Sequence, residues 1–239
     1  IDPRSPVLAG KCYEHTLARL DDDLKALRVK MVDLVLIHAP PCVPGASWNK
    51  GCVGPDQQDP VYPHLANCNH PDACEMVQQQ WKALEAAYAQ GKTRAIGVSN
   101  YCSACLRCIS KIATVQPHVN QIQLHAGMQS ADPSGLVSYT RGIGAKIQAY
   151  RPLAQGRLMK DPTVSDIATA HDKSTAQVAL KWVVQQGHAA ITTTENIAHM
   201  RGNNDIFGWE LSQPEMDRLS KMDPPQGWLD NIVGELCML

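Results

Sequence analysis

The segment VDLVLIHAP at residues 32–40 constrains the fold more than any other part of the sequence. Its apolar residues follow one another almost without a polar interruption, which is typical of a parallel strand buried on both faces. The run ends on His38, and Pro40 stops further strand pairing. Because parallel α/β folds carry their chemistry at the carboxyl ends of strands, His38 is a candidate catalytic residue. The alternative is a hydrogen-bonded core histidine without a catalytic role.

A strand followed by a helix recurs about five times along the chain, which predicts a parallel sheet with helices outside it. Ser174 with Gln177, and Ser212 with Glu215, have the spacing of capping boxes at helix starts. A chain of 239 residues is long enough for one α/β barrel domain over residues 1–239. Strands are expected at 32–38, 93–99, 119–125, 146–150 and 189–193, and helices at 12–28, 72–90, 101–112, 132–141, 164–171, 175–186 and 195–203.

The remaining segments are a long loop and a tail. Residues 41–70 are rich in Pro, Gly, Asn and Cys, and a loop of this length after a strand end is expected to form a wall of the substrate pocket. Residues 223–239 show no clear element. Polar residues gather where the predicted strands end, at His38, Ser99–Asn100, Gln121–His125, Tyr150 and Thr193–Thr194.

Charge and composition narrow the function. The formal net charge is −1, which gives no electrostatic reason to expect binding to nucleic acid or to an anionic membrane. No apolar run is long enough to span a bilayer, and the first ten residues lack the pattern of a signal peptide. The sequence also has no Gly-rich phosphate fingerprint and no P-loop, so a Rossmann domain is not expected.

Seven of the nine cysteines form two groups. The first group could form one or two disulfides in an oxidising compartment. The second has CxxCxxC spacing, which raises the possibility of a metal or iron–sulfur site, but no fourth ligand completes it. We favour buried free cysteines on one helix face for the second group. The groups are Cys42, Cys52, Cys68 and Cys74, and Cys102, Cys105 and Cys108.

Four segments resemble successive signatures of the aldo-keto reductases: VDLVLIHAP, WKALEAAYAQGKTRAIGVSNY, VNQIQLH and AYRPLAQG. The resemblance extends from about residue 12 to residue 222. It implies a (β/α)8 TIM-type barrel, of which this chain holds about the last five βα units. It also implies reduction of aldehydes or ketones by hydride transfer from extended NADPH.

The resemblance assigns roles at the nicotinamide end of such a cofactor. His38 matches the histidine that orients the substrate carbonyl, and a neutral imidazole N–H suits this task. Ser99, Asn100 and Gln121 match the group that holds the carboxamide, which offers both a donor and an acceptor. Tyr150 matches the ring that stacks on the nicotinamide.

The adenosine end departs from the family pattern of a Lys-Ser pair followed by an Arg. Without those cations we expect a weak 2′-phosphate clamp, so that NADPH, NADH and no dinucleotide all remain open as cofactor assignments. Arg201 or Arg157 could compensate in part. The resemblance implies contacts along the pyrophosphate from Arg151, Leu153 and Gln155. At the adenosine end it implies contacts from Thr193, Thr194, His199 and Asn203. Gly202 stands where the family commonly has an acidic residue.

The proton donor of the family is a Tyr supported by a Lys and an Asp, on units that precede the histidine strand. Only about thirty residues precede Val32 here, and they do not match those motifs. We therefore expect this chain alone to be inactive. One alternative is an inactive barrel remnant that serves as a structural subunit, with a protein partner covering its open sheet edges. Another is a cysteine-based redox or metal module. The cytoplasm is the family's default compartment, and an organelle is the alternative.

Overall fold

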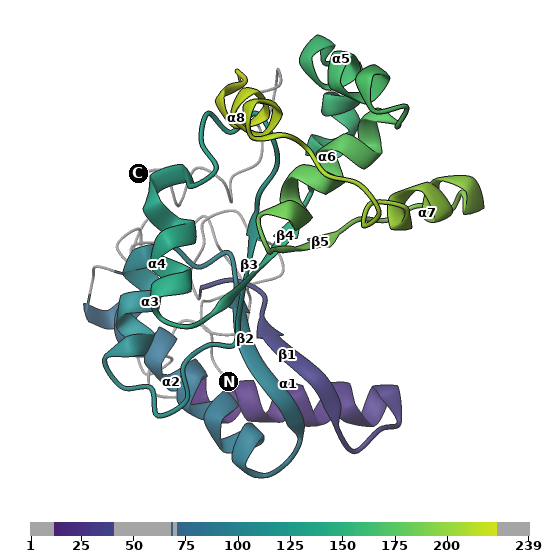
Figure 1. Cartoon of the computed structure of the whole chain (residues 1–239). Helices are drawn as coiled ribbons and strands as arrows, with labels where there is room; N and C mark the ends of the chain where they lie inside the picture. Colours follow the sequence, from purple (N-terminus) through teal and green to yellow (C-terminus); the bar gives the residue numbers. More distant parts are fainter. Residues whose placement is uncertain (1–11, 41–67, 69–70, 224–239) are drawn as a thin grey trace, which may run out of the picture. The chain divides into compact units, whose positions relative to one another are not determined.

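A computed structural model describes residues 12–40, 68 and 71–223 (Figure 1). It contains one sheet of five strands whose order, β1-β2-β3-β4-β5, follows the chain. The β1–β2 and β4–β5 pairs are parallel, as predicted. The chain divides into two compact units, each described by itself below: unit 1 is Ile1–Asn120 with Gly142–Ala145, and unit 2 is Gln121–Arg141 with Lys146–Leu239.

Unit 1 holds the first two strands and their helices, close to the predicted bounds. On α1, Leu20 and Leu24 are buried against Ala87 of α2, and this core includes Val32 and Val35 of β1. Leu27, the last residue of α1, is 63% exposed. The elements are α1 (Cys12–Leu27), β1 (Val32–Ile37), α2 (Pro71–Ala89), β2 (Thr93–Ser99) and α3 (Ser103–Ser110), and β3 (Val119–Gln123) begins here.

The prediction that β1 is buried on both faces is wrong. Five of its six residues are only half-buried and Asp33 is exposed. The reason is that β1 is the end strand of the described sheet and pairs there with β2 alone. The next strand, β2, is the better covered one, with its last four residues buried.

Unit 2 is built on a helical core around α6. Trp182 and Val178 of α6 are fully buried, together with Ile167 of α5, and the Trp182 indole N–H donates to Ser220 Oγ at 3.1 Å. Both predicted capping boxes are present, at the starts of α6 and α8. The elements are η3 (Pro133–Gly135), α4 (Leu136–Gly142), β4 (Lys146–Tyr150), η4 (Ala154–Lys160), α5 (Pro162–Ala170), α6 (Thr175–Gln185), β5 (Ala189–Ile191), α7 (Ile197–Asn204) and α8 (Gln213–Lys221).

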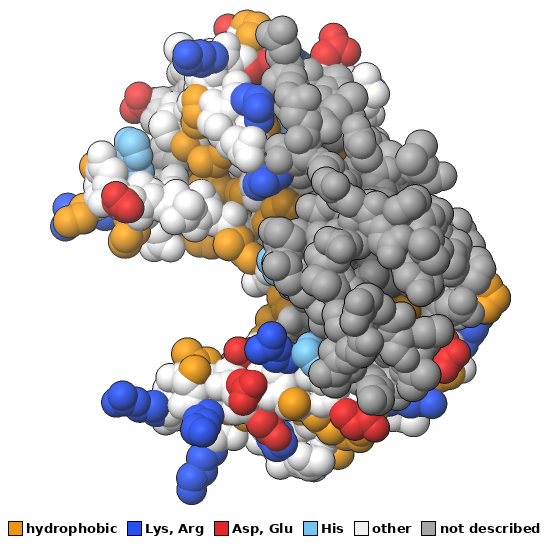
Figure 2. Space-filling view, turned by 180° about the vertical axis from the view of Figure 1, so that it is seen from behind, with side chains coloured by type: hydrophobic (Ala, Val, Ile, Leu, Met, Phe, Trp, Pro, Cys, Tyr) orange, Lys and Arg blue, Asp and Glu red, His pale blue; other side chains and the backbone are white. Residues whose placement is uncertain are grey.

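Three further expectations concern the surface charge, membrane-spanning segments and the long loop at 41–70. On the face seen in Figure 2, side chains of both charge signs lie interspersed, in keeping with the net charge of −1. Within the described part of the chain, no helix has the length and apolar character needed to cross a membrane. The predicted pocket wall at 41–70 lies outside the described residues except for Cys68.

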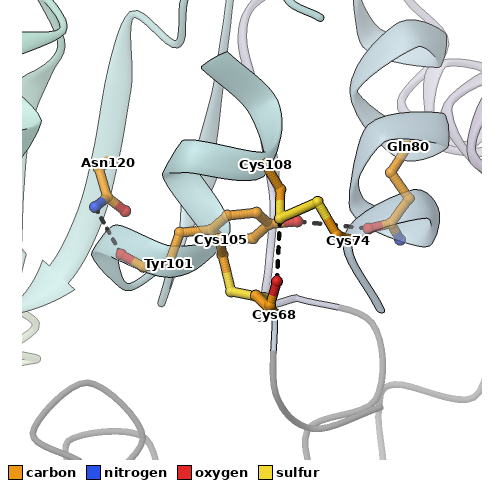
Figure 3. The surroundings of a disulfide bond; sticks show 7 residues. All are labelled: Cys68, Cys74, Gln80, Tyr101, Cys105, Cys108 and Asn120. Carbon is orange, nitrogen blue, oxygen red and sulfur yellow. Dashed lines mark hydrogen bonds between the residues drawn. A yellow bond between two sulfur atoms is a disulfide. The ribbon is translucent and has the colours of Figure 1, made fainter. Parts of the chain in front are cut away.

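Two disulfides join α3 to the start of α2, and they overturn the expectation of free cysteines (Figure 3). They are Cys68–Cys105 and Cys74–Cys108, with Cα atoms 5.0 Å and 5.4 Å apart, within the range that a disulfide spans. Helical spacing puts Cys105 and Cys108 on one face of α3, as predicted. That face packs on α2 and on Cys68, where each sulfur meets a partner from the first cysteine group.

The metal interpretation of CxxCxxC also fails, because all three of its cysteines are disulfide-bonded, Cys102 included. A disulfide sulfur is no longer a thiolate ligand. Cys12 is disulfide-bonded as well. Among residues 12–40, 68 and 71–223 no group of three or more His, Cys, Asp or Glu side chains is placed to hold a metal ion.

Gly97 sits where β2 lies close to both neighbours, and we expect Gly97→Ala to destabilise unit 1. An added Cβ would clash with the carbonyl oxygen of Val119 and lie 2.8 Å from Leu36 Cδ2. Overpacking of this kind costs about 1–3 kcal/mol of unfolding free energy. Gly142→Ala is the matched control, since no atom lies within 4 Å of its added Cβ. Equal denaturation midpoints for the two variants would contradict the close packing.

Removing the disulfides should destabilise unit 1 in a non-additive way. The two loops share residues 74–105, so either cross-link alone keeps much of the unfolded chain constrained. We expect each Cys→Ser pair to cost less than about 2–4 kcal/mol of unfolding free energy, and removal of both pairs to cost more than the sum. Denaturation midpoints of the three variants measure this. Free thiols at these four cysteines in the unreduced protein would refute the pairing.

Candidate functional site

The candidate residues of unit 1 meet where β1 and β2 end. The side-chain amide of Asn100 donates to the His38 carbonyl oxygen at 2.8 Å and to Ser99 Oγ at 3.2 Å. Ser99 and Asn100 are buried, whereas the His38 side chain is exposed. Since His38 is not in the core, the interpretation as a core histidine does not describe it. Three of the predicted residues are therefore in one cluster at the carboxyl ends of two parallel strands.

The backbone of Asn100 is in the left-handed region, with φ of 62°. Asn is among the few non-glycine residues that adopt this conformation at modest cost. The next residue, Tyr101, is fully buried, and its carbonyl oxygen accepts from Asn120 Nδ2 at 3.0 Å (Figure 3). The Tyr101 hydroxyl lies 3.5 Å from Gln80 Oε1 on α2. The turn from β2 to α3 is thus fixed on both sides of Asn100.

The core-histidine interpretation does describe His125, at the end of the predicted third strand. Its ring is fully buried, and Nδ1–H donates to the Ala126 carbonyl oxygen at 2.7 Å. Burial is the main cause that lowers the pKa of His125, with that hydrogen bond opposing it. His125 therefore stays neutral and forms part of the packing of unit 2.

Unit 2 carries the other residues predicted for the nicotinamide end. Gln121 of β3 donates from Nε2 to Gln148 Oε1 of β4 at 2.9 Å. Tyr150 ends β4, and the Arg151 guanidinium carbon lies 5.9 Å from the centre of its ring. Burial raises the pKa of the Tyr150 phenol to about 12, against a smaller opposing effect of the Arg151 charge. Tyr150 is therefore a neutral aromatic ring at ordinary pH.

The segment after β4 folds into η4, which the sequence did not predict. Arg151 and Gln155 have φ values of 52° and 57°, so the chain turns sharply here. The Arg157 side chain donates to Gln155 Oε1 at 2.7 Å. Arg157 is one of the two arginines considered above as replacements for the family's cations at the 2′-phosphate. Its side chain is engaged by Gln155 in this structure.

A cavity of about 540 Å³ lies within unit 2, at the starts of α6 and α7. It brings together five of the predicted cofactor residues, Leu153, Thr193, Thr194, His199 and Asn203. Arg151 and Gln155 are not among its lining residues. The lining that sequence reasoning missed comes mainly from the first turn of α6, where the capping box signalled only a helix start: Met159, Ser174, Thr175, Ala176, Gln177 and Ala198.

The cavity can bind a polar ligand that has an apolar part. Hydroxyl, amide and imidazole groups face it beside the side chains of Leu153 and Met159. This mixture is typical of sites for small molecules and cofactors, in which a few polar groups fix the orientation of a largely apolar contact. An adenine ring with its ribose has this character.

Comparison with known proteins relates this chain to one family of oxidoreductases. The model of the Aldo/keto reductase family matches residues 3–224. A glyoxal reductase of Bacillus subtilis is 34% identical over 213 residues, which are 88% of this chain and 64% of the relative. Deoxymugineic acid synthase 1 of Hordeum vulgare is 31% identical over 216 residues, which are 87% of this chain and 63% of the relative. The chain thus spans less than two thirds of these relatives.

Solved structures agree with the sequence comparison. The apo form of Gox0644 superposes with a TM-score of 0.71 at 29% identity, covering 90% of this chain and 67% of that one. A mutant of Gox0644 in complex with NADPH superposes with a TM-score of 0.69 at 29% identity, covering 89% and 66%. With its parallel strands, its external helices and a matching family model over nearly all of its length, this chain belongs to the aldo/keto reductase family.

Proposed function

We propose that this chain supplies the cofactor-binding and carbonyl-binding residues of a nicotinamide-dependent reductase of small aldehydes or ketones. The observation that carries the proposal is the cavity of unit 2, which is lined by the residues assigned to the adenosine end of the cofactor. The NADPH complex of the related Gox0644 mutant supports a nicotinamide dinucleotide as the ligand.

At the nicotinamide end, we assign the carboxamide to Ser99, Asn100 and Gln121. Amide and hydroxyl groups suit a carboxamide because both partners donate and accept hydrogen bonds. We assign Tyr150 to stacking, in keeping with its neutral ring. A bound reduced nicotinamide would supply the hydride. His38 would donate an imidazole N–H to the carbonyl oxygen and stabilise the negative charge that develops there.

Reduction of a carbonyl also requires a proton for the developing alkoxide. A phenol whose pKa is raised to about 12 is a poor acid near neutral pH, so Tyr150 does not suit this step. We assign no residue of this chain to the roles of the Tyr, Lys and Asp that supply it in the family. We therefore propose that the chain by itself binds the cofactor and does not turn over a carbonyl substrate.

A structural role in a larger assembly is the second candidate. It is favoured by exposed apolar side chains in unit 2, of which Phe207 is 71% and Ile197 66% exposed. The described sheet also ends on β1 and β5, and the backbone edge of an end strand can pair with another chain. In this case a protein partner would cover these features.

Titration with reduced cofactor tests the first candidate. We expect saturable quenching of tryptophan fluorescence by NADH or NADPH at micromolar concentrations. With glyoxal as the test carbonyl, we expect no loss of reduced-nicotinamide absorbance. Absence of quenching at high micromolar concentrations of both cofactors would reject cofactor binding and leave the structural candidate. Steady turnover of glyoxal would show that the chain has a proton donor that we have not assigned.

Substitution of Tyr150 separates stacking from acid chemistry. We expect Tyr150→Phe to bind the cofactor as the unchanged chain does, because the ring is retained. Tyr150→Ala should weaken binding by about 1–3 kcal/mol, the usual contribution of an aromatic ring stacked on a base. Tyr139→Ala on α4, outside the site, is the control, and fluorescence titration gives the dissociation constants. A defect in Tyr150→Phe as large as that in Tyr150→Ala would rule out stacking as the role of this residue.

A further inference from the structure

The described residues that line the cavity of unit 2 are all uncharged types or histidine. Among these twelve residues there is no Lys, Arg, Asp or Glu. The polar groups of the cavity are the hydroxyls of Ser174, Thr175, Thr193 and Thr194, the amides of Gln177 and Asn203, and the imidazole of His199. Ser174 and Gln177 hydrogen-bond each other, and Gln177 also donates to Asp205, so we expect a ligand to use mainly the other groups. Hydroxyl, amide and imidazole groups pair well with ribose hydroxyls and adenine nitrogens, whereas a phosphate is usually bound by Arg or Lys.

The two helix starts beside the cavity are also partly closed to an anion. At α7, Asn196 Oδ1 accepts from the N–H groups of Ala198 and His199, at 2.8 Å and 3.4 Å. At α6, Ser174 Oγ accepts from Gln177 N at 3.2 Å, and Gln177 Oε1 accepts from Ser174 N at 3.0 Å. Free N–H groups at a helix start are what attracts a phosphate, so these internal caps weaken both candidate anion sites.

The cations nearest in sequence are engaged elsewhere or lie outside the lining. Lys173 Nζ donates to Asp205 Oδ2 at 2.9 Å, and the same carboxylate oxygen accepts from Gln177 Nε2 at 3.2 Å. Arg157 donates to Gln155. Arg201 of α7 and Lys160, which follows the lining residue Met159, are exposed and are not among the lining residues. The charge of Lys173 is therefore compensated by Asp205, and none of these cations is among the lining residues.

The uncharged lining and the capped helix starts bear on which dinucleotide binds, provided that the cavity holds the cofactor as proposed above. We infer that the cavity selects the dinucleotide with a free 2′-hydroxyl, NADH, over NADPH. A phosphate monoester carries a charge of about −1.5 to −2 near neutral pH. Placing it in this cavity would remove water from the charge without supplying a cation, which is unfavourable. A ribose hydroxyl meets neutral donors and acceptors there.

The test compares the two cofactors by titration at about pH 8, where an ordinary imidazole is neutral. We expect NADH to bind at least about tenfold more tightly than NADPH. Equal or tighter binding of NADPH would overturn the inference and leave the proposed function in place. If neither cofactor binds, both the inference and the proposed function fail.

A cation placed in the cavity should reverse the preference. We expect Thr194→Arg to raise the affinity for NADPH relative to that for NADH about tenfold, because an arginine fork matches a phosphate. Thr169→Arg, on the exposed face of α5, is the matched control and should change neither. His199→Arg, at an exposed position of the lining, serves if Thr194→Arg does not fold. No gain in the affinity for NADPH relative to that for NADH from a folded variant would overturn the inference.

Discussion

The hydrogen bond from the Asn100 side chain to the His38 carbonyl oxygen is the contact on which the unit 1 part of the site depends. It joins the carboxyl ends of β1 and β2, which are parallel and in register along their length. It also requires Asn100 to hold a left-handed backbone, and the buried Tyr101 fixes that conformation from the other side. A short polar side chain thus stabilises a turn that most residues would avoid.

The disulfides serve the same part of the fold by covalent means. Cys105 and Cys108 tie α3 to the segment that enters α2, a few residues after the Asn100 turn (Figure 3). Unit 1 also has an apolar core, in which Trp81 and Leu84 of α2 and Ile96 of β2 are almost fully buried. Cross-links that restrict the unfolded chain add to the stability of such a core, and they form and persist in oxidising surroundings.

The electrostatics of unit 2 are those of a neutral binding surface. Burial keeps the Tyr150 phenol protonated, and the cavity presents hydroxyls and amides in place of charged side chains. Ion pairs of this unit include Lys173 with Asp205, which contacts Gln177 of the lining, and Arg218 with Asp166. These exposed or half-exposed pairs contribute little to stability, so the helical core around Trp182 holds the unit together.

The sequence by itself determined the strands, most of the α-helices and their order, although not η4. Strand bounds such as 93–99 and the capping boxes at Ser174 and Ser212 follow from local patterns that the structure reproduces. Strand bounds and helix caps depend on hydrogen bonding and side-chain periodicity within a few residues of each other. Thr193, Thr194, His199 and Asn203 were assigned through the family resemblance instead, and they line one cavity.

Only the tertiary structure decided which distant residues meet. It paired Cys68 with Cys105 and Cys74 with Cys108, although helical spacing alone was equally consistent with buried thiols. It left β1 half-buried, and it brought the first turn of α6 to the cavity. Spacing along the chain determines which residues share a face of a helix or strand. What that face contacts is determined by how the elements pack on one another, and this packing depends on contacts between residues far apart in sequence.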